Sequence, residues 1–285
     1  MIQYVMVKKH WIFLIPLFIF LLLLAKNPFS IRTLIPNLEP YPDTIHYLSP
    51  AWNAVAGHDF QLFREGRGLK SWVPPMYSFV MIPAFLLKND VRMFYFVNVG
   101  LSILSLFFFY LILRKITKNT LLIGVTLFLY VTNYFIYWYP SLAMGENLIL
   151  TLFLAGIWLT TLSLTPITLI FTPVIAVLIY LTKSANIPIS ICIGLFYFIR
   201  ILTETKSKNK TKNAKIFLIT SGILLSLITI FADELGGGNI ISSFIFFFTN
   251  LFPKQETTHL IKAQVSQQPT GWFSLGYMKN FLPDY

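Results

Sequence analysis

Long apolar stretches alternate with short polar segments along most of the chain. In lipid every backbone N–H and C=O group needs an internal partner, so apolar runs of roughly 17 to 25 residues predict transmembrane helices. A further apolar piece, Ile240–Phe252, is at the short limit for a crossing and predicts an interfacial or re-entrant helix. The expected fold is therefore all-α, a polytopic integral membrane protein with about seven or eight transmembrane helices. The expected spans cover residues 11–25, 93–113, 120–139, 147–164, 167–182, 185–202 and 216–232.

The apolar run Met76–Leu87 is too short to cross a bilayer. Twelve residues at a helical rise of 1.5 Å span about 18 Å, against a hydrocarbon core of about 30 Å. We expect this run to dip into the outer leaflet, so that residues 26–92 form one long external loop with juxtamembrane helices. The polar segment 203–215 is expected to be a solvated linker.

Composition supports a membrane protein, and the distribution of charge orients it. The chain of 285 residues is 56% hydrophobic and 12% charged, with a mean hydropathy of +0.69 and a net charge of +11. Eleven basic residues lie in three short segments, 8–9, 114–118 and 200–215, together with a single acid, Glu204. Basic residues in short loops stay in the cytoplasm, so this surplus sets topology and does not indicate a nucleic-acid partner. The expected location is the plasma membrane, multi-pass, with a cytoplasmic N-terminus that is an uncleaved anchor.

Two acidic residues on the extracytoplasmic side are candidates for chemistry. Glu146 is the only acid between Asp90 and Glu204, and Asp43 precedes an amphipathic segment. Each has an ordinary structural alternative, because helix N-termini favour carboxylates and Asp is a preferred N-cap. The lone Cys192 excludes a disulfide framework and a thiolate metal cluster.

Cations accompany these acids on the same expected face. Lys183 is the only charge between Asn147 and Ile199, at an expected helix end. Arg64, Arg67 and Lys70 fit a phosphate clamp and interfacial snorkelling equally well. His46 lies one turn after Asp43, and its spacing to neighbouring acids matches no compact metal signature, so it is expected to be a surface residue.

The order of these parts resembles the GT-C superfamily of membrane glycosyltransferases that use polyprenyl-phosphate sugars. That superfamily includes protein O-mannosyltransferases, aminoarabinose transferases and oligosaccharyltransferases. The resemblance covers roughly residues 1–232 and leaves 233–285 as a C-terminal extension. The stretches that carry it are Pro42-Asp43-Thr44-Ile45-His46-Tyr47 with Ala51 and Gly57, Pro74-Pro75-Met76-Tyr77, Arg92, and Tyr139-Pro140 to Glu146.

The resemblance implies a role for each candidate. Asp43 would be the catalytic base, Glu146 the second external acid of the site, and Lys183 the neutralising partner of the lipid phosphate. Substrate-binding roles extend to His46, Arg64, Arg67 and Lys70. No cofactor is certain, and the use of a divalent metal stays open.

Three functions therefore compete at this point. The first is transfer of a sugar from a polyprenyl-phosphate carrier in the bilayer to a lipid, glycan or protein acceptor. The second is transport or flipping of lipid-linked sugars, which also needs a charged external cavity. The third is a non-catalytic membrane scaffold with the same fold.

Overall fold

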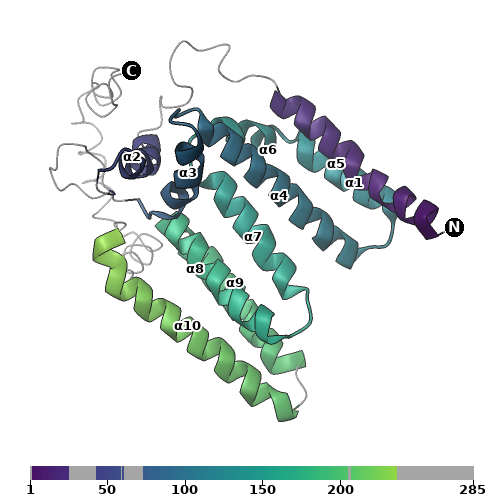
Figure 1. The fold of residues 1–285 in the computed structure, drawn as a ribbon. Coiled ribbons are helices and arrows are strands. Elements are labelled where there is room, and N and C mark those ends of the chain that lie inside the picture. Colours follow the sequence, from purple (N-terminus) through teal and green to yellow (C-terminus); the bar gives the residue numbers. More distant parts are fainter. Residues whose placement is uncertain (1, 26–42, 59, 61–72, 205–206, 236–285) are drawn as a thin grey trace, which may run out of the picture.

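The computed structural model describes residues 2–25, 43–58, 60, 73–204 and 207–235, and it is helical with no strand in these ranges (Figure 1). The all-α class expected from the sequence is therefore confirmed for the described residues. The C-terminal segment 236–285, including Ile240–Phe252, lies outside them. The helices are α1 Ile2–Ala25, α2 Asp43–Val55, α3 Met76–Leu87, α4 Met93–Ile116, α5 Thr120–Thr132, α6 Tyr134–Trp138, η1 Tyr139–Ser141, α7 Glu146–Thr160, α8 Pro166–Thr182, η2 Ser184–Asn186, α9 Ile187–Glu204 and α10 Ser207–Leu235.

Each of the seven apolar stretches is largely helical. Three helical segments are long and apolar enough to cross a membrane, namely Met93–Ile116, Ser184–Thr203 and Asn209–Ile230. The pair α5 and α6 would be a fourth if it forms one bent span. The other apolar helical segments are shorter than 18 residues, namely Trp11–Ala25 within α1, Met76–Leu87, Glu146–Thr160 and Pro166–Thr182. These lengths and compositions indicate a membrane-associated protein.

The long helices lie side by side, and α2 and α3 lie across one end of them (Figure 1). From one edge to the other, α1 packs on α5, α4 on α7, α7 on α8, and α8 on both α9 and α10. Successive long helices run in alternating directions, so α4, α7 and α9 begin at the end that carries α2 and α3 (Figure 1). We call this the α2–α3 end. The helix starts gathered there position the candidate site.

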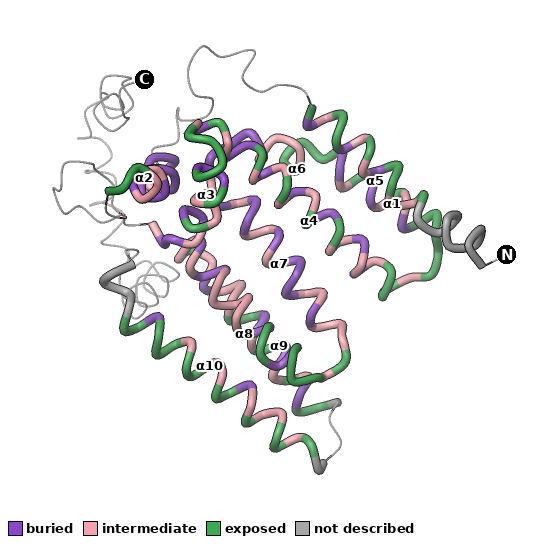
Figure 2. Tube along the Cα trace, viewed as in Figure 1, coloured by how far each residue is buried: buried purple, intermediate pink, exposed green. Residues whose placement is uncertain are grey.

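Buried side chains form separate clusters along this row of helices, not one central core (Figure 2). At the α2–α3 end the fully buried side chains include Tyr47, Tyr77 and Phe94. Elsewhere Phe20, Leu106 and Leu127 join α1, α4 and α5. The outward faces carry exposed apolar residues, above all on α10, which suits helices whose outer surface meets lipid.

Polar side chains define the helix ends in several places. Asn119 caps α5 by accepting hydrogen bonds from the backbone N–H groups of Leu121 and Leu122. Thr165 and Thr168 form a capping box at the start of α8. Asn133 separates α5 from α6, which meet at 57°, so the span predicted over 120–139 is a bent pair of helices. Asn133 ends α5 and caps α6 through its side chain, so it sets the position of this bend.

The prediction of a solvated linker over residues 203–215 is wrong for most of that segment. Helix α9 continues to Glu204, and α10 begins at Ser207. Lysine is a good helix former, and its long side chain reaches water from a helical backbone. Polarity therefore did not mark the end of the helix here.

The turn between α3 and α4 is held by Asp90. Its carboxylate accepts hydrogen bonds from the backbone N–H of Arg92 and from the guanidinium of the same residue, at 2.7 to 3.1 Å, and Lys88 Nζ lies 3.3 Å away. The hydrogen bonds from Arg92 hold the pKa of the Asp90 carboxyl well below its ordinary value. This turn fixes how α3 folds back onto α4.

We expect enlargement of Gly156 to separate three helices. A Cβ atom on Gly156 in α7 would lie 3.0 Å from Ile193 Cδ1 on α9 and 3.4 Å from Ile175 Cγ2 on α8. Gly156→Leu should therefore lower the thermal unfolding midpoint in mild detergent, at a cost of about 1–3 kcal/mol for overpacking. The matched control is Gly100→Leu, because a Cβ atom on Gly100 meets nothing within 4 Å. Equal midpoints for the two variants would contradict this packing.

Candidate functional site

An ion pair joins the start of α7 to the end of α8. Glu146 is the first residue of α7, and Lys183 directly follows α8. Lys183 Nζ donates to Glu146 Oε1 at 2.8 Å, and the two side chains are only 32% and 24% exposed. Each charge suits its helix end, because helix N-termini favour anions and C-termini favour cations. Two of the residues singled out in the sequence are thus in direct contact.

The second carboxylate oxygen of Glu146 is not used by this ion pair. Glu146 Oε2 is buried and accepts no hydrogen bond from the described residues, and the same holds for Asn147 Nδ2 as a donor. A buried polar atom without a partner costs about 1–3 kcal/mol. A bound hydroxyl group that donated to Oε2 would remove this cost. The carboxylate therefore offers a ready acceptor for a polar ligand.

A cavity of about 310 Å³ lies against the ion pair. Its size is at the lower limit of small-molecule sites, about 300 Å³. It combines two charges and one amide with apolar walls from α7 and α9. The lining residues are Glu146, Ile149, Leu150, Phe153, Lys183, Ala185, Asn186 and Ile189.

Close backbone approach at Gly145 explains why the two charges meet. A Cβ atom at Gly145 would lie 3.0 Å from Thr182 Cγ2 and 3.7 Å from Tyr47 Cε1. Gly145 and Thr182 directly precede Glu146 and Lys183, so their contact places the two charged side chains together. The same glycine brings α2 against the start of α7. A larger residue here would push three elements apart.

A buried amide holds the loop that leads into Glu146. Asn98 on α4 donates through Nδ2 to the carbonyl oxygens of Leu142 at 2.7 Å and Pro140 at 3.3 Å. Its Oδ1 accepts a hydrogen bond of 3.0 Å from the hydroxyl of Tyr77 on α3. Burial raises the pKa of the Tyr77 phenol above its ordinary value, so the hydroxyl keeps its proton and acts as the donor. One side chain thus joins α3, α4 and the loop before α7.

Helix α2 reaches the site through Tyr47. The Tyr47 ring packs edge-on against Tyr77 with centroids 5.4 Å apart, and its carbonyl accepts a 2.6 Å hydrogen bond from Ser78 Oγ. Asp43 is the first residue of α2, one turn before Tyr47 or about 6 Å along the helix. Its backbone therefore lies at the same end as Glu146, while its side chain lies outside what the structure describes. His46 is half-buried on α2.

The remaining expected site residues cannot be placed. Arg64, Arg67 and Lys70 lie outside the described residues. Within the described part of the chain, no group of three or more His, Cys, Asp or Glu side chains gathers to hold a metal ion. The use of a divalent metal therefore stays as open as the sequence left it.

Asn98 and Tyr77 are two residues of the site whose roles were not predicted from the sequence. Asn98 was a polar residue inside the apolar segment 93–113, and a polar side chain buried in such a helix needs a partner. That signal could have identified it. Tyr77 was noted only as part of a Pro-Pro segment, and its partner could not be inferred from spacing.

Loss of the Asn98 amide should destabilise the loop before Glu146 strongly. Asn98→Leu removes the donor to two carbonyls and the acceptor for Tyr77, at about 1–3 kcal/mol for each group left unsatisfied. Tyr77→Phe should cost less, and in the double variant the two costs should not add, because the residues share one hydrogen bond. Unfolding midpoints in detergent measure both effects. Asn89→Leu, at an exposed position, is the matched control and should change little; full additivity would contradict the coupling.

Comparison with known proteins yields no relative for this chain. No protein-family model, no curated protein and no solved structure matches it. A functional proposal must therefore stand on the geometry at the α2–α3 end and on the pattern of residues in the sequence.

Proposed function

We propose that this protein is a membrane glycosyltransferase that moves a sugar from a polyprenyl-phosphate carrier to an acceptor on the extracytoplasmic face. The observation that carries the proposal is the Glu146–Lys183 ion pair beside a cavity, at the end where α2 begins with Asp43. A lipid-borne phosphosugar needs a cation for its phosphate, acceptors for its hydroxyl groups and access from the bilayer. The motif resemblance to GT-C enzymes supports the same assignment.

The reaction would be a displacement at the anomeric carbon of the donor. The acceptor hydroxyl forms the new C–O bond, the bond from that carbon to the phosphate oxygen breaks, and its electron pair leaves with the phosphate. Asp43 takes the proton of the acceptor as general base. Lys183 stabilises the charge that develops on the departing lipid phosphate.

Glu146 has two roles in this scheme. Without substrate its Oε1 holds Lys183 at the cavity, and its free Oε2 offers a hydrogen-bond acceptor to a sugar or acceptor hydroxyl. Arrival of the donor phosphate would let Lys183 exchange one anionic partner for another. The preformed ion pair therefore keeps the Lys183 side chain at the cavity until the donor phosphate binds.

The topology that fits this function has seven spans with the N-terminus in the cytoplasm. The spans would be α1, α4, the bent pair α5–α6, α7, α8, α9 and α10, with α2 and α3 at the outer surface. The lysine-rich start of α10 and the basic end of α4 then lie on the cytoplasmic side, where such residues are retained. The candidate site opens on the opposite side.

Activity should depend on the two acids to different degrees. With a panel of polyprenyl-phosphate hexoses and crude lipid and glycan acceptors, Asp43→Asn should lower the transfer rate by about 10²–10⁴-fold, as expected for loss of a general base. Glu146→Gln and Lys183→Gln should cause smaller losses and raise the apparent KM for the donor.

The matched control for this assay is Asp90→Asn. It makes the same carboxylate-to-amide change in the α3–α4 turn, where the charged partners of Asp90 are Arg92 and Lys88. Asp90→Asn should keep the transfer rate once its folded fraction is verified. Equal rates for wild type and Asp43→Asn would sink the catalytic assignment.

Cysteine labelling should report the proposed topology. Cys192 is exposed on α9, so it is first replaced by Ala. A membrane-impermeant maleimide added outside intact cells should then label Ser71→Cys but not Ser207→Cys, and Thr117→Cys should behave like Ser207→Cys. Labelling of positions 71 and 207 from the same side would overturn the arrangement of spans.

A further inference from the structure

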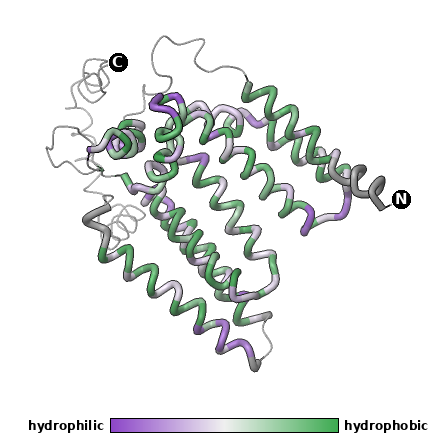
Figure 3. The backbone as a smooth tube through the Cα atoms, in the orientation of Figure 1, coloured by the Kyte–Doolittle hydropathy of each residue, from purple (hydrophilic) through white to green (hydrophobic). Residues whose placement is uncertain are grey.

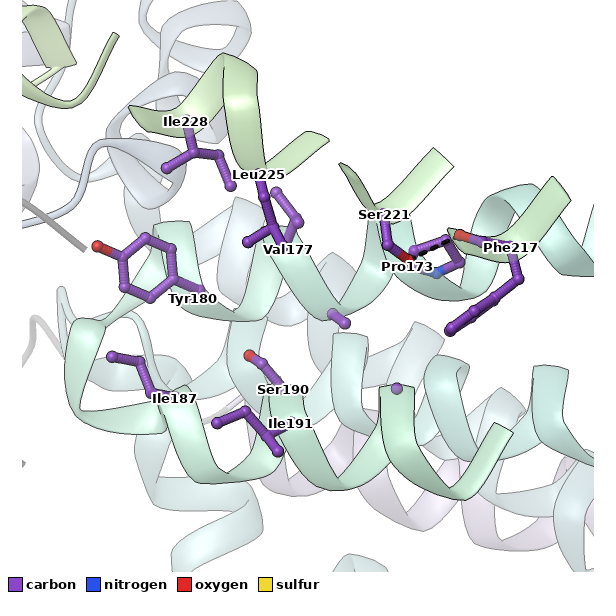
Figure 4. Close-up of a pocket in the computed structure, with 12 residues that line it drawn as sticks. Pro173, Val177, Tyr180, Ile187, Ser190, Ile191, Phe217, Ser221, Leu225 and Ile228 are labelled. Atoms are coloured by element: carbon purple, nitrogen blue, oxygen red, sulfur yellow. Dashed lines mark hydrogen bonds between the residues drawn. The ribbon is translucent and has the colours of Figure 1, made fainter. Parts of the chain in front are cut away.

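A second cavity lies between α8, α9 and α10 (Figure 4). Its volume is about 370 Å³. It is lined along α10 by Phe217, Ser221, Leu225 and Ile228, a stripe with helical spacing on one face. We call this cavity the α10 groove.

The α10 groove presents hydrocarbon almost throughout. Both of its serine hydroxyls donate to backbone carbonyls four residues earlier. Ser221 Oγ donates to the Phe217 carbonyl at 2.8 Å (Figure 4), and Ser190 Oγ donates to the Asn186 carbonyl at 3.4 Å. The other lining residues are mainly aliphatic. An occupant of this groove is therefore recognised by its apolar surface, as an alkyl chain would be.

Small residues keep the middle of the groove open between two packed ends. At one end Phe217 packs with Leu169, Tyr197 and Ile201, and at the other Ile228 packs with Tyr180 and Ile187. Between them lies Gly194 on α9, where a Cβ atom would meet nothing within 4 Å. The groove therefore lies between two well-packed contacts of α10 with α8 and α9, and it is part of how these three helices pack.

The end of the groove at Phe217 is bordered by positive charge. Lys210, Lys212 and Lys215 lie in the first turns of α10, directly before Phe217, and Lys212 and Lys215 are exposed. Figure 3 shows this polar start beside the apolar remainder of the helix. The segment 200–215 carries six basic residues against one acid, Glu204. The acids whose side chains the structure describes, Asp90 and Glu146, lie at the opposite end.

The groove has the length of one leaflet. From Phe217 to Ile228, eleven residues at 1.5 Å rise give about 16 Å, roughly half of a 30 Å hydrocarbon core. A phospholipid whose chain fills the groove from the Phe217 end would therefore place its phosphate at the level of the lysines. Anionic lipids also concentrate in the cytoplasmic leaflet, where basic segments attract them.

We infer that the α10 groove binds one acyl chain of an anionic glycerophospholipid, with the headgroup phosphate held by the lysines at the start of α10. This site requires α10 to be inserted in a membrane, and it does not depend on the proposed transferase activity. Charge favours an anionic phospholipid as the occupant, because Lys210, Lys212 and Lys215 lie just before the Phe217 end of the groove.

The test is lipid binding to the purified full chain, measured by native mass spectrometry. Phosphatidylglycerol and phosphatidylcholine with identical acyl chains are titrated against wild type and variants. Lys210→Gln, Lys212→Gln and Lys215→Gln combined should weaken the binding of phosphatidylglycerol about tenfold or more, because basic residues near the headgroups attract anionic lipids. The binding of phosphatidylcholine should weaken much less, because its choline cation compensates the charge of its phosphate.

Filling the groove tests the chain-binding part separately. Gly194→Leu should reduce the retained fraction of both lipids, because its side chain enters the open middle of the groove. Gly222→Leu is the matched control, since Gly222 is exposed on α10 and a Cβ atom there meets nothing within 4 Å. Equal lipid retention by the two variants would overturn the groove as the binding site.

Photocrosslinking of the wild type keeps the inference testable if Gly194→Leu does not fold. Phosphatidylglycerol with a diazirine in one acyl chain should form adducts on residues 217–228 of α10 or on the facing positions of α8 and α9. Adducts confined to other helices would refute the inference. Stronger competition by an isoprenoid phosphate than by phosphatidylglycerol would assign the groove to the isoprenoid instead.

Discussion

The buried amide of Asn98 is the interaction on which the candidate site depends. The loop between α6 and α7 leaves backbone carbonyls without helical partners, and in an apolar surrounding each must find a donor. Asn98 supplies that donor from α4 and at the same time accepts from Tyr77 on α3. This fixes the loop whose last residue, Gly145, lies against Thr182. The meeting of Glu146 and Lys183 follows from that contact.

The two ends of the molecule differ in charge, with a neutralised ion pair at the α2–α3 end and a surplus of basic residues at the other. At the α2–α3 end, two opposite charges sit on helix termini that favour them and neutralise each other beside a cavity. At the other end basic residues dominate, and they border an apolar groove between α8, α9 and α10. The first arrangement suits a small polar ligand with a phosphate, and the second suits a lipid. The same row of helices therefore offers two chemically distinct sites.

Most of the helical layout could be predicted from the sequence, and its errors have physical causes. The lengths of the apolar stretches, and the short run 76–87 that follows two prolines, predicted where the helices lie. They do so because a chain in lipid must satisfy its backbone hydrogen bonds internally, which favours helices. Asn133 was not recognised as the point where 120–139 bends, since one capping amide within an apolar stretch changes hydropathy little. The polarity of the lysines in 207–215 predicts a linker, but lysine also has a high helix propensity and these residues are helical. Asn98 carries the only amide side chain in the segment 93–113, and its burial requires partners that spacing alone does not identify.

The sequence by itself predicted the all-α fold of the described residues, the dominance of apolar helices among them, and the position of Asp43, Glu146 and Lys183 as rare charges at helix ends. Local patterns can do this because hydropathy and capping act over a few residues. Only the tertiary structure decided that Glu146 and Lys183 touch, that Asn98 holds the loop before them, and that α10 leaves a groove against α8 and α9. These depend on contacts such as Gly145 with Thr182, between residues far apart in the sequence. Such contacts are set by how whole helices pack, which no local pattern records.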